Sequence, residues 1–256
     1  MVDLSRPWPL GIGEQQWWRT VTVLVVIELI AVMFDHPISV WATQLPEILR
    51  NTLAEFTPYG ESGWVLYPSG VLLVVTALLA RFVPWKLMRL LLNEFTALWA
   101  FIFLGVGLPS LISTIVKRLG RPRPMHYATD GLFGFHPNWA DWTYQSFPSG
   151  HATTAFALAA VVGFVSERWF YPALVFAGAI GLSRITEGVH YPSDVFGGTV
   201  LGLLGAYGVR LFFARRGWLF TERPDGRIAP RPMSALKRYI ALKRRDIAPG
   251  PRPDRP

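Results

Sequence analysis

The sequence contains no cysteine. This absence excludes disulfide frameworks, thiolate zinc sites and cysteine nucleophiles. Charge is also scarce, because only 16% of the 256 residues are Asp, Glu, Lys or Arg, whereas a soluble domain usually carries about 25%. Hydrophobic residues make up 51% of the chain, and the mean hydropathy is +0.30. Scarce charge and high hydrophobicity together predict a protein that is embedded in a lipid bilayer.

The net charge of +8 is concentrated at one end of the chain. Residues 215–256 hold twelve Lys or Arg and four Asp or Glu, which accounts for the whole excess. This Pro-rich segment follows an apolar one, as expected for a cytoplasmic tail that is disordered or contacts anionic membrane lipids. No aromatic stacking platform accompanies the charges, so the sequence argues against nucleic acid as a partner.

Six segments are mostly apolar and approach the length of a spanning helix, which is about 20 residues. They cover approximately residues 18–34, 64–83, 90–116, 151–165, 170–185 and 195–213. We therefore expect an all-α integral membrane bundle of six transmembrane helices over residues 18–214. A cytoplasmic segment (1–17) would precede it and the basic cytoplasmic tail (215–256) would follow. The fourth and fifth segments are short and rich in Ala and Gly, and by hydropathy alone they also fit buried core helices.

The orientation is predicted from basic residues in the short loops. If both termini are cytoplasmic, the basic residues between the second and third segments and between the fourth and fifth also lie inside. The loop 35–63 is then outside, and its apolar residues between 41 and 56 suggest a helix that lies on the membrane or packs on the protein. Residues 117–124 are densely basic yet fall outside, which suggests an anion-binding role. We expect a bacterial inner (cell) membrane protein with its active site on the periplasmic or outer face.

Three short polar segments converge on this outer side: residues 117–124, 148–151 and 183–194. The guanidinium groups of Arg123 and Arg184 suit a phosphate group. The predicted helix start at Ser149, Gly150 and His151 offers backbone N–H groups to the same anion. These residue types indicate phosphoryl transfer.

A nucleophile and an acid are available among the same segments. His190 can attack phosphorus if a partner occupies its other ring nitrogen, and Asp194, four residues later, can reach back to that nitrogen. His151 can protonate the departing oxygen as a general acid.

Pro148-Ser149-Gly150-His151 and Ser183-Arg184-x5-His190-x3-Asp194 resemble the motifs of the type 2 phosphatidic acid phosphatase superfamily. That superfamily includes bacterial lipid phosphatases and vanadium-dependent haloperoxidases. The resemblance implies a phosphohistidine intermediate at His190, with no metal and no cofactor. The catalytic set that it implies is His190, His151 and Asp194, and the phosphate-binding set is Lys117, Arg123, Ser149, Gly150 and Arg184.

The first motif departs from the family pattern, which is Lys-x6-Arg-Pro. Here five residues separate Lys117 from Arg123-Pro124. One residue of slip on a helix rotates a side chain by about 100°. Lys117 then misses the phosphate unless the helix ends early and its long side chain compensates, and Arg118 or Arg121 could take its place.

We therefore expect a membrane lipid phosphatase that hydrolyses a phosphomonoester or diphosphate of a lipid. Undecaprenyl diphosphate is favoured as substrate, and phosphatidate, phosphatidylglycerophosphate and lipid A phosphate are the other candidates. The alternatives are a vanadate-dependent haloperoxidase-like enzyme and a non-catalytic protein that binds or transports a lipid phosphate. The six predicted spans argue against the first, and the intact histidines argue against the second.

The roles of several residues outside the motifs can be interpreted in two ways. The aromatic residues of segment 125–147, Trp139 among them, form either a lid beside the site or an aromatic belt at headgroup level. Gly198 and Gly202 indicate close helix packing or the seam of a homodimer. Glu28 and Glu94 lie within predicted helices away from the motifs, where interhelical pairing or interfacial placement is favoured. Glu187 is interpreted as structural.

Overall fold

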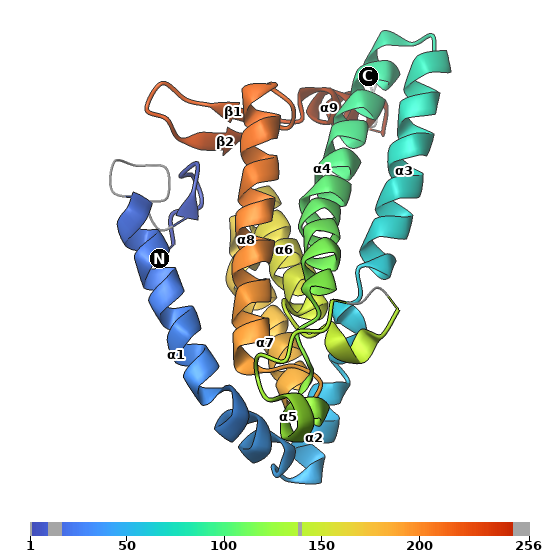
Figure 1. Cartoon of the computed structure of the whole chain (residues 1–256). Coiled ribbons are helices and arrows are strands. Elements are labelled where there is room, and N and C mark those ends of the chain that lie inside the picture. The colour runs from blue at the N-terminus through green and yellow to red at the C-terminus, as the bar shows by residue number, and fades with distance from the viewer. Residues whose placement is uncertain (1, 10–16, 138–139, 248–256) are drawn as a thin grey trace, which may run out of the picture.

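Figure 1 shows a helical bundle, which the computed structural model describes over residues 2–9, 17–137 and 140–247. Trp139 and parts of both predicted terminal segments (1, 10–16 and 248–256) lie outside the described residues. The six predicted apolar segments all form helices. These are α1 (Trp17–Thr43), α3 (Gly63–Phe82), α4 (Lys86–Val116), α6 (Gly150–Val165), α7 (Phe170–Thr186) and α8 (Pro192–Arg215).

Within the described ranges, four helical segments are long and apolar enough to cross a membrane: α1, α3, α8 and the helical run that begins at Lys86. α6 is equally apolar but has 16 residues, and α7 has 17. The all-α membrane class is therefore confirmed. A bundle of six spans stays a prediction.

Shorter elements connect the long helices. They are α2 (Glu47–Ala54), η2 (Thr57–Gly60), η3 (Lys117–Leu119), η4 (Pro124–His126), α5 (Tyr127–Asp130), η5 (Trp142–Tyr144) and η6 (Glu167–Trp169). After α8 come the antiparallel strands β1 (Phe220–Glu222) and β2 (Ile228–Pro230), in which Thr221 lies opposite Ala229, and then helix α9 (Ser234–Ile247).

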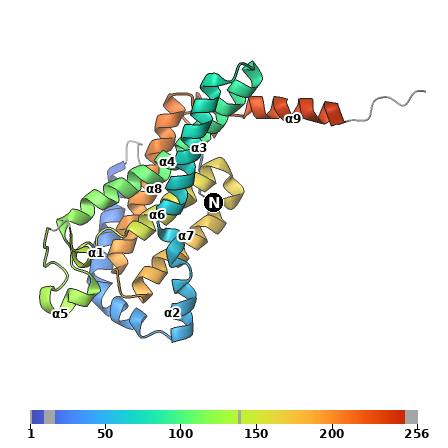
Figure 2. The same ribbon diagram turned by 90° about the vertical axis from the view of Figure 1, so that its right-hand side faces the viewer.

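α6 is the central helix of the bundle, and α4, α7 and α8 pack around it (Figures 1 and 2). Its alanines, among them Ala152, Ala157 and Ala160, are fully buried. A helix that is apolar on all sides is buried inside a protein or a membrane. Small side chains also let neighbouring helices approach closely, and this packing brings the first turns of α6 and α8 together.

The first helix is longer than predicted. Its predicted end was Phe34, but α1 continues through Pro37 to Thr43 and contains Asp35 with none of its surface exposed. Asp35 was expected in an outer loop, and that expectation is wrong because an ion pair with Arg121 and hydrogen bonds from Ser193 hold it inside the protein. The expected amphipathic helix corresponds to α2, which packs on α7 while Ile48 remains 79% exposed.

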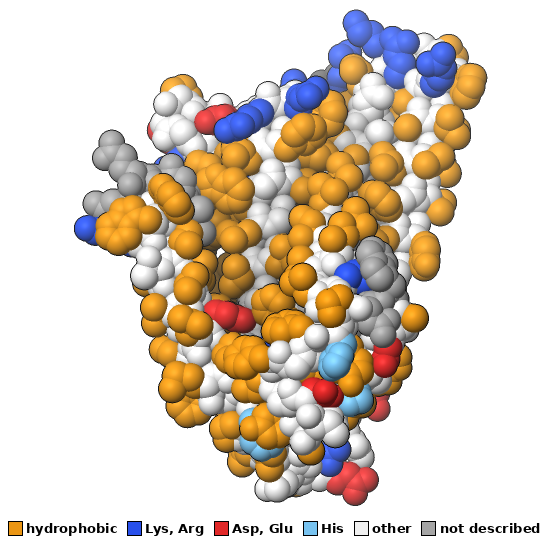
Figure 3. All heavy atoms as spheres, viewed as in Figure 1, with side chains coloured by type: hydrophobic (Ala, Val, Ile, Leu, Met, Phe, Trp, Pro, Cys, Tyr) orange, Lys and Arg blue, Asp and Glu red, His pale blue; other side chains and the backbone are white. Residues whose placement is uncertain are grey.

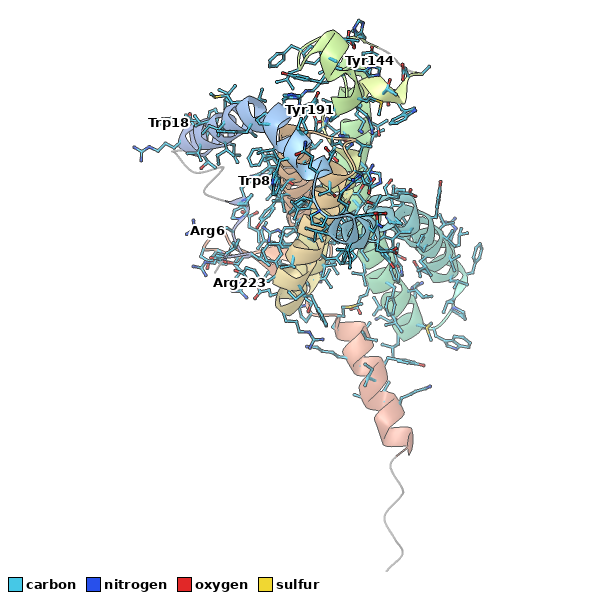
Figure 4. The ribbon with its side chains drawn as sticks, turned by 90° about the horizontal axis from the view of Figure 1, so that it is seen from below. Arg6, Trp8, Trp18, Tyr144, Tyr191 and Arg223 are labelled. Carbon is cyan, nitrogen blue, oxygen red and sulfur yellow. The ribbon has the colours of Figure 1, made fainter. Side chains whose placement is uncertain are left out.

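The N-terminal segment and the start of the tail pack together on the bundle. Arg210 donates hydrogen bonds to the carbonyl oxygens of Leu4 and Arg6, and the Ile228 N–H donates to the Ser5 carbonyl at 2.7 Å. Leu4 and Ile228 are buried in the main core, and Figure 4 shows Arg6 and Arg223 on the same side of the molecule. The described part of the tail before α9 is therefore folded.

Charged side chains are unevenly distributed over the two ends of the molecule. In the view of Figure 3, Lys and Arg gather near the α3–α4 turn, and His side chains lie toward the opposite end. Glu94 accepts hydrogen bonds from the Ala235 and Leu236 N–H groups, at 2.9 and 3.1 Å. It therefore caps α9 at the basic end, which agrees with the expected helix pairing.

Candidate active site

The three polar motifs are held together by backbone hydrogen bonds. The Ser149 N–H donates to the Asp194 carbonyl at 2.8 Å and thereby joins the start of α6 to the start of α8. The Ser146 N–H donates to the Arg121 carbonyl at 3.1 Å and joins the loop before α6 to the segment that follows η3. Segments far apart in sequence thus meet at one end of the bundle.

Asp194 is fully buried in the first turn of α8 and is held by several donors. Its Oδ2 accepts the Ser146 hydroxyl at 2.5 Å and the Tyr191 N–H at 2.8 Å. The Tyr191 bond belongs to a capping box, which satisfies a backbone donor at the helix start. Its Oδ1 accepts from Arg121 at 2.7 Å. The carboxylate position is therefore fixed by the surrounding protein.

His190 lies immediately before α8 with 1% of its surface exposed. Its Nδ1 is 3.6 Å from the Asp194 Oδ2, which is longer than a hydrogen bond. Such contacts in a substrate-free site often tighten only when substrate binds. Burial lowers the pKa of His190 to about 3, and Asp194 opposes this shift only in part. The ring is consequently neutral near pH 7, the form that can act as a nucleophile.

Three cations surround the two imidazoles. The charges of Lys117, Arg123 and Arg184 all interact electrostatically with His151, at the start of α6. Those of Lys117 and Arg123 also act on His190. Lys117 and Arg123 therefore act on both rings and Arg184 acts on His151, so cations that suit a phosphate group lie beside the two imidazoles.

Arg123 and Arg184 are each 8% exposed. The Arg123 guanidinium stacks 4.7 Å from the centre of the Trp142 ring. Arg184 donates to Glu187 at 2.8 Å and to the Thr57 hydroxyl at 3.2 Å. Within the described part of the chain, the Nε of each arginine is buried without a hydrogen-bond partner. A bound anion or water could satisfy these donors, and the phosphate-binding roles of both arginines stay a prediction.

Lys117 reaches the start of α6 despite the shortened motif. α4 ends at Val116, and the chain continues through η3 to Gly120, whose φ of 80° is left-handed. The Lys117 Nζ donates to the Gln145 carbonyl at 3.2 Å, and a Cβ on Gly150 would lie 3.4 Å from the lysine Cε. Lys117 therefore lies beside the start of α6, and its contact with phosphate stays a prediction.

Ser149 is the N-cap of α6, and its hydroxyl accepts from the Ala152 N–H at 3.5 Å. Gly150 is the first helical residue. The backbone N–H groups of a first helical turn are suited to binding anions. The phosphate-binding roles of both residues stay a prediction.

Arg121 does not replace Lys117. It is 4% exposed and makes ion pairs with Asp35 and Asp194, both at 2.7 Å. A guanidinium held between two carboxylates is not available to a phosphate, so the hypothesis that Arg121 substitutes for Lys117 is wrong.

Several polar contacts of the site were not predicted. Asp35 was missed because the first apolar segment was predicted to end at residue 34; the signal was a carboxylate beside a long apolar run. A single sequence contains no pattern that predicts the contacts of Ser146, Ser193 and Thr57. Glu28, in α1, interacts electrostatically with Arg121 and Asp194, so it is closer to the motifs than expected.

A cavity of about 470 Å³ adjoins His151. Residues 60–67, at the start of α3, form one wall, and Ser110 and Thr114 of α4 form another. Gly150, His151 and Thr154 of α6 complete the lining. Glu187, which the sequence analysis interpreted as structural, does not line this cavity. Its carboxylate accepts hydrogen bonds from Thr57 and Arg184.

No cluster of three or more His, Cys, Asp or Glu side chains able to hold a metal occurs in the described ranges. Two imidazoles, one fixed carboxylate and three cations can instead bind a phosphate group and transfer it to nitrogen.

Comparison with known proteins finds one family model and several relatives of the same superfamily. The sequence model of the PAP2 superfamily matches residues 96–218. Lipid A 1-phosphatase from Rhizobium johnstonii is 31% identical over 234 residues, which cover 88% of this chain and 93% of that protein. Undecaprenyl-diphosphatase BcrC from Bacillus subtilis is 29% identical over 127 residues, 46% of this chain and 63% of that protein.

A solved structure is also similar. The PAP2-type phosphatidylglycerolphosphate phosphatase from Bacillus subtilis aligns with a TM-score of 0.49 and 24% identity. The alignment covers 76% of this chain and 96% of that protein.

Proposed function

This chain belongs to the PAP2 superfamily and is a phosphoester hydrolase of a bacterial membrane, and on that premise we propose that it removes phosphate from a lipid at the outer face of the bilayer. One observation carries the proposal: the charges of Lys117 and Arg123 act on both His151 and His190, and His151 lines a cavity between α3, α4 and α6. The cavity suits a lipid whose headgroup lies at the interface.

The proposed reaction has two steps. In the first, the His190 Nε2 attacks phosphorus and forms a P–N bond while the P–O bond to the lipid breaks, and His151 gives a proton to the departing oxygen. In the second, water attacks the phosphohistidine, His151 takes a proton from that water, and inorganic phosphate leaves.

The other groups support both steps. Asp194 holds the proton-bearing Nδ1 of His190, so that Nε2 is free to attack. Arg123, Arg184 and Lys117, with the backbone N–H groups at Ser149 and Gly150, stabilise the charge on the phosphoryl oxygens.

We propose the 1-phosphate of lipid A as the preferred substrate. The relative with this activity in its name aligns over nearly the whole of both proteins. Undecaprenyl diphosphate, which the sequence alone favoured, is the second candidate, because the relative that bears its name aligns over less than half of this chain.

The proposed orientation places both termini in the cytoplasm. The Lys and Arg side chains that gather near the α3–α4 turn and α9 support it, because cytoplasmic loops carry an excess of basic residues. The site at the opposite end then faces outward.

The test is a phosphate-release assay on the purified full-length protein in detergent, with lipid A 1-phosphate, undecaprenyl diphosphate and phosphatidate in parallel. We expect turnover in EDTA, fastest with lipid A 1-phosphate, and a loss of about 10⁴-fold or more in His190→Asn. Acid-labile, nitrogen-linked phosphate should be trapped on the wild-type protein alone.

Each contrary result removes a different part of the proposal. Turnover in His190→Asn would exclude the phosphohistidine, and loss of activity on chelation would exclude the metal-free reaction. Tight binding of the lipids without turnover would indicate a binding protein instead. A preference for undecaprenyl diphosphate would change the substrate alone.

A further inference from the structure

Asp35 of α1 is buried at the rear of the candidate active site. None of its surface is exposed. Its Oδ1 accepts the Ser193 N–H at 2.9 Å, and its Oδ2 accepts the Ser193 hydroxyl at 2.6 Å and the Arg121 Nη2 at 2.7 Å. A buried carboxylate with three donors is strongly fixed in position.

Arg121 links this carboxylate to the one beside His190. Its Nη1 donates to the Asp194 Oδ1 and to the Ser193 hydroxyl, both at 2.7 Å. Its guanidinium also lies 4.9 Å from the centre of the Tyr191 ring, and Figure 4 shows Tyr191 beside α1. One guanidinium thus connects α1 to the first turn of α8.

We propose that Asp35 is a positioning residue for the phosphatase reaction: it holds Arg121 on Oδ1 of Asp194. The side of Oδ2 that faces His190, beside its Ser146 and Tyr191 donors, thereby stays free of the guanidinium. This inference rests on the proposed function. Asp35 acts through Arg121 and Asp194 and does not contact the substrate.

The geometry gives the reason. In Asp35→Asn the side chain offers one oxygen in place of two to its three donors. Where Ser193 keeps that oxygen, the Arg121 Nη2 becomes a buried donor without a partner, which costs free energy. Its favourable new partner is Asp194, because guanidinium and carboxylate groups pair through two parallel hydrogen bonds. The second of these bonds would engage Oδ2, the oxygen that faces His190 Nδ1 at 3.6 Å.

The negative charge of Asp35 also supports the reaction at His190. Asp35 and Asp194 share one guanidinium, so these three groups carry a net negative charge beside His190. A negative neighbour favours the positive imidazole that forms as P–N bonding proceeds. Removal of the Asp35 charge would weaken that stabilisation.

The test compares Asp35→Asn with wild type in the full-length enzyme, with lipid A 1-phosphate as substrate and the amount of folded protein determined for each. We expect kcat per folded enzyme to fall about 10-fold or more, because a misoriented catalytic group loses rate rather than binding. KM and the inhibition constant of inorganic phosphate should stay within about 3-fold, since the phosphate-binding groups are unchanged.

Ser39→Ala is the matched control. Ser39 lies one turn after Asp35 on α1, is 4% exposed, and its hydroxyl has no hydrogen-bond partner among the described residues. Its loss should leave kcat at the wild-type value. A role of Asp35 in stability alone would lower the yield of folded protein and the unfolding temperature, with kcat unchanged.

Ser193→Ala is a milder second variant, for use if Asp35→Asn does not fold. It removes the hydroxyl bridge and retains the Arg121–Asp35 ion pair, so we expect a 2- to 5-fold lower kcat at unchanged KM, roughly the effect of one lost hydrogen bond. If the Asp35→Asn variant folds, or the Ser193→Ala variant where it does not, and its kcat equals that of wild type, the positioning role is overturned while the proposed function stands. Absence of wild-type turnover on the whole lipid panel overturns the proposed function and, with it, this inference.

Discussion

Asp194 receives hydrogen bonds from three directions, and its position on α8 adds a fourth favourable interaction. Ser146, Tyr191 and Arg121 all donate to its carboxylate. The first turn of a helix also carries partial positive charge that stabilises an anion. Because every partner is itself anchored in the protein, the carboxylate has little freedom to follow His190. Small changes in these partners are therefore expected to change the orientation of the nucleophile.

The buried imidazole of His190 makes stability depend on pH. Its pKa is lowered to about 3 in the folded protein, whereas an unfolded chain has a histidine pKa of about 6.5. As the pH falls from 7 to 5, the unfolded chain gains this proton and the folded protein does not, so stability is lost. The loss continues until the pH reaches the folded pKa and then stops.

We predict that wild type loses on the order of 2 kcal/mol more unfolding free energy between pH 7 and pH 5 than His190→Asn does. The measurement is denaturant unfolding in detergent at the two pH values. The difference between the two proteins isolates His190 from the other titrating groups. Equal losses in both would mean that His190 has the same pKa in the folded protein as in the unfolded chain.

Residue spacing predicted part of the site and could not predict the rest. His190 and Asp194 are one helical turn apart, so their approach depends on local structure that the sequence specifies. Asp35 and Arg121 are 86 residues apart, and their pairing depends on how α1 packs against α8. A single sequence contains the two charges but no information on which tertiary contact joins them.

At the scale of elements, α6 and α8 approach so closely that two glycines are required. A Cβ on Gly202 would lie 2.4 Å from the Thr153 carbonyl oxygen, and one on Gly198 would lie 2.5 Å from that of Ser149. Both neighbours are backbone atoms, which cannot move aside without shifting a helix. The interpretation of Gly198 and Gly202 as close packing within the chain is thus confirmed, and a homodimer stays untested.

We predict that Gly202→Ala destabilises the protein by about 1–3 kcal/mol, because an overpacked helix contact forces the backbone to shift. Gly178→Ala, in α7, is the matched control, since nothing lies within 4 Å of its added Cβ. The control should be neutral or more stable by about 0.5–1 kcal/mol, the usual helix preference of Ala over Gly. Thermal unfolding in detergent measures both, and equal behaviour of the two variants would contradict the packing argument.

The ends of the helices were predicted less well than their existence. Six apolar runs were identified and all six are helical, because apolar length is a strong local signal. The end of α1 was misplaced by nine residues, since a polar Asp35-His36-Pro37 sequence normally ends a helix. Here a distant arginine compensates the aspartate, and that compensation is visible only in three dimensions.

At the scale of the whole molecule, the two ends of the bundle differ in chemistry. The end near the α3–α4 turn carries the basic side chains, the β1–β2 hairpin and α9 (Figures 1 and 3). The opposite end carries the candidate site, α5 and η5, and Figure 4 labels Tyr144 of η5. Such a polarised molecule is expected to insert in one direction.

The orientation can be measured by single cysteines, because the natural chain has none. Ala128→Cys lies in the exposed part of α5, and Thr221→Cys lies on the exposed side of β1. We predict that a membrane-impermeant maleimide labels Ala128→Cys in cells whose outer membrane is permeabilised, and labels Thr221→Cys only after the inner membrane is disrupted. Labelling in the reverse order would invert the proposed topology.

The cavity beside His151, walled by α3, α4 and α6, has a kinetic consequence. A substrate that arrives from within a leaflet is encountered by diffusion in a plane, and its effective concentration is its mole fraction among the surrounding lipids. Turnover in vesicles should then be insensitive to the volume of buffer but should fall when inert phospholipid is added at a constant amount of substrate.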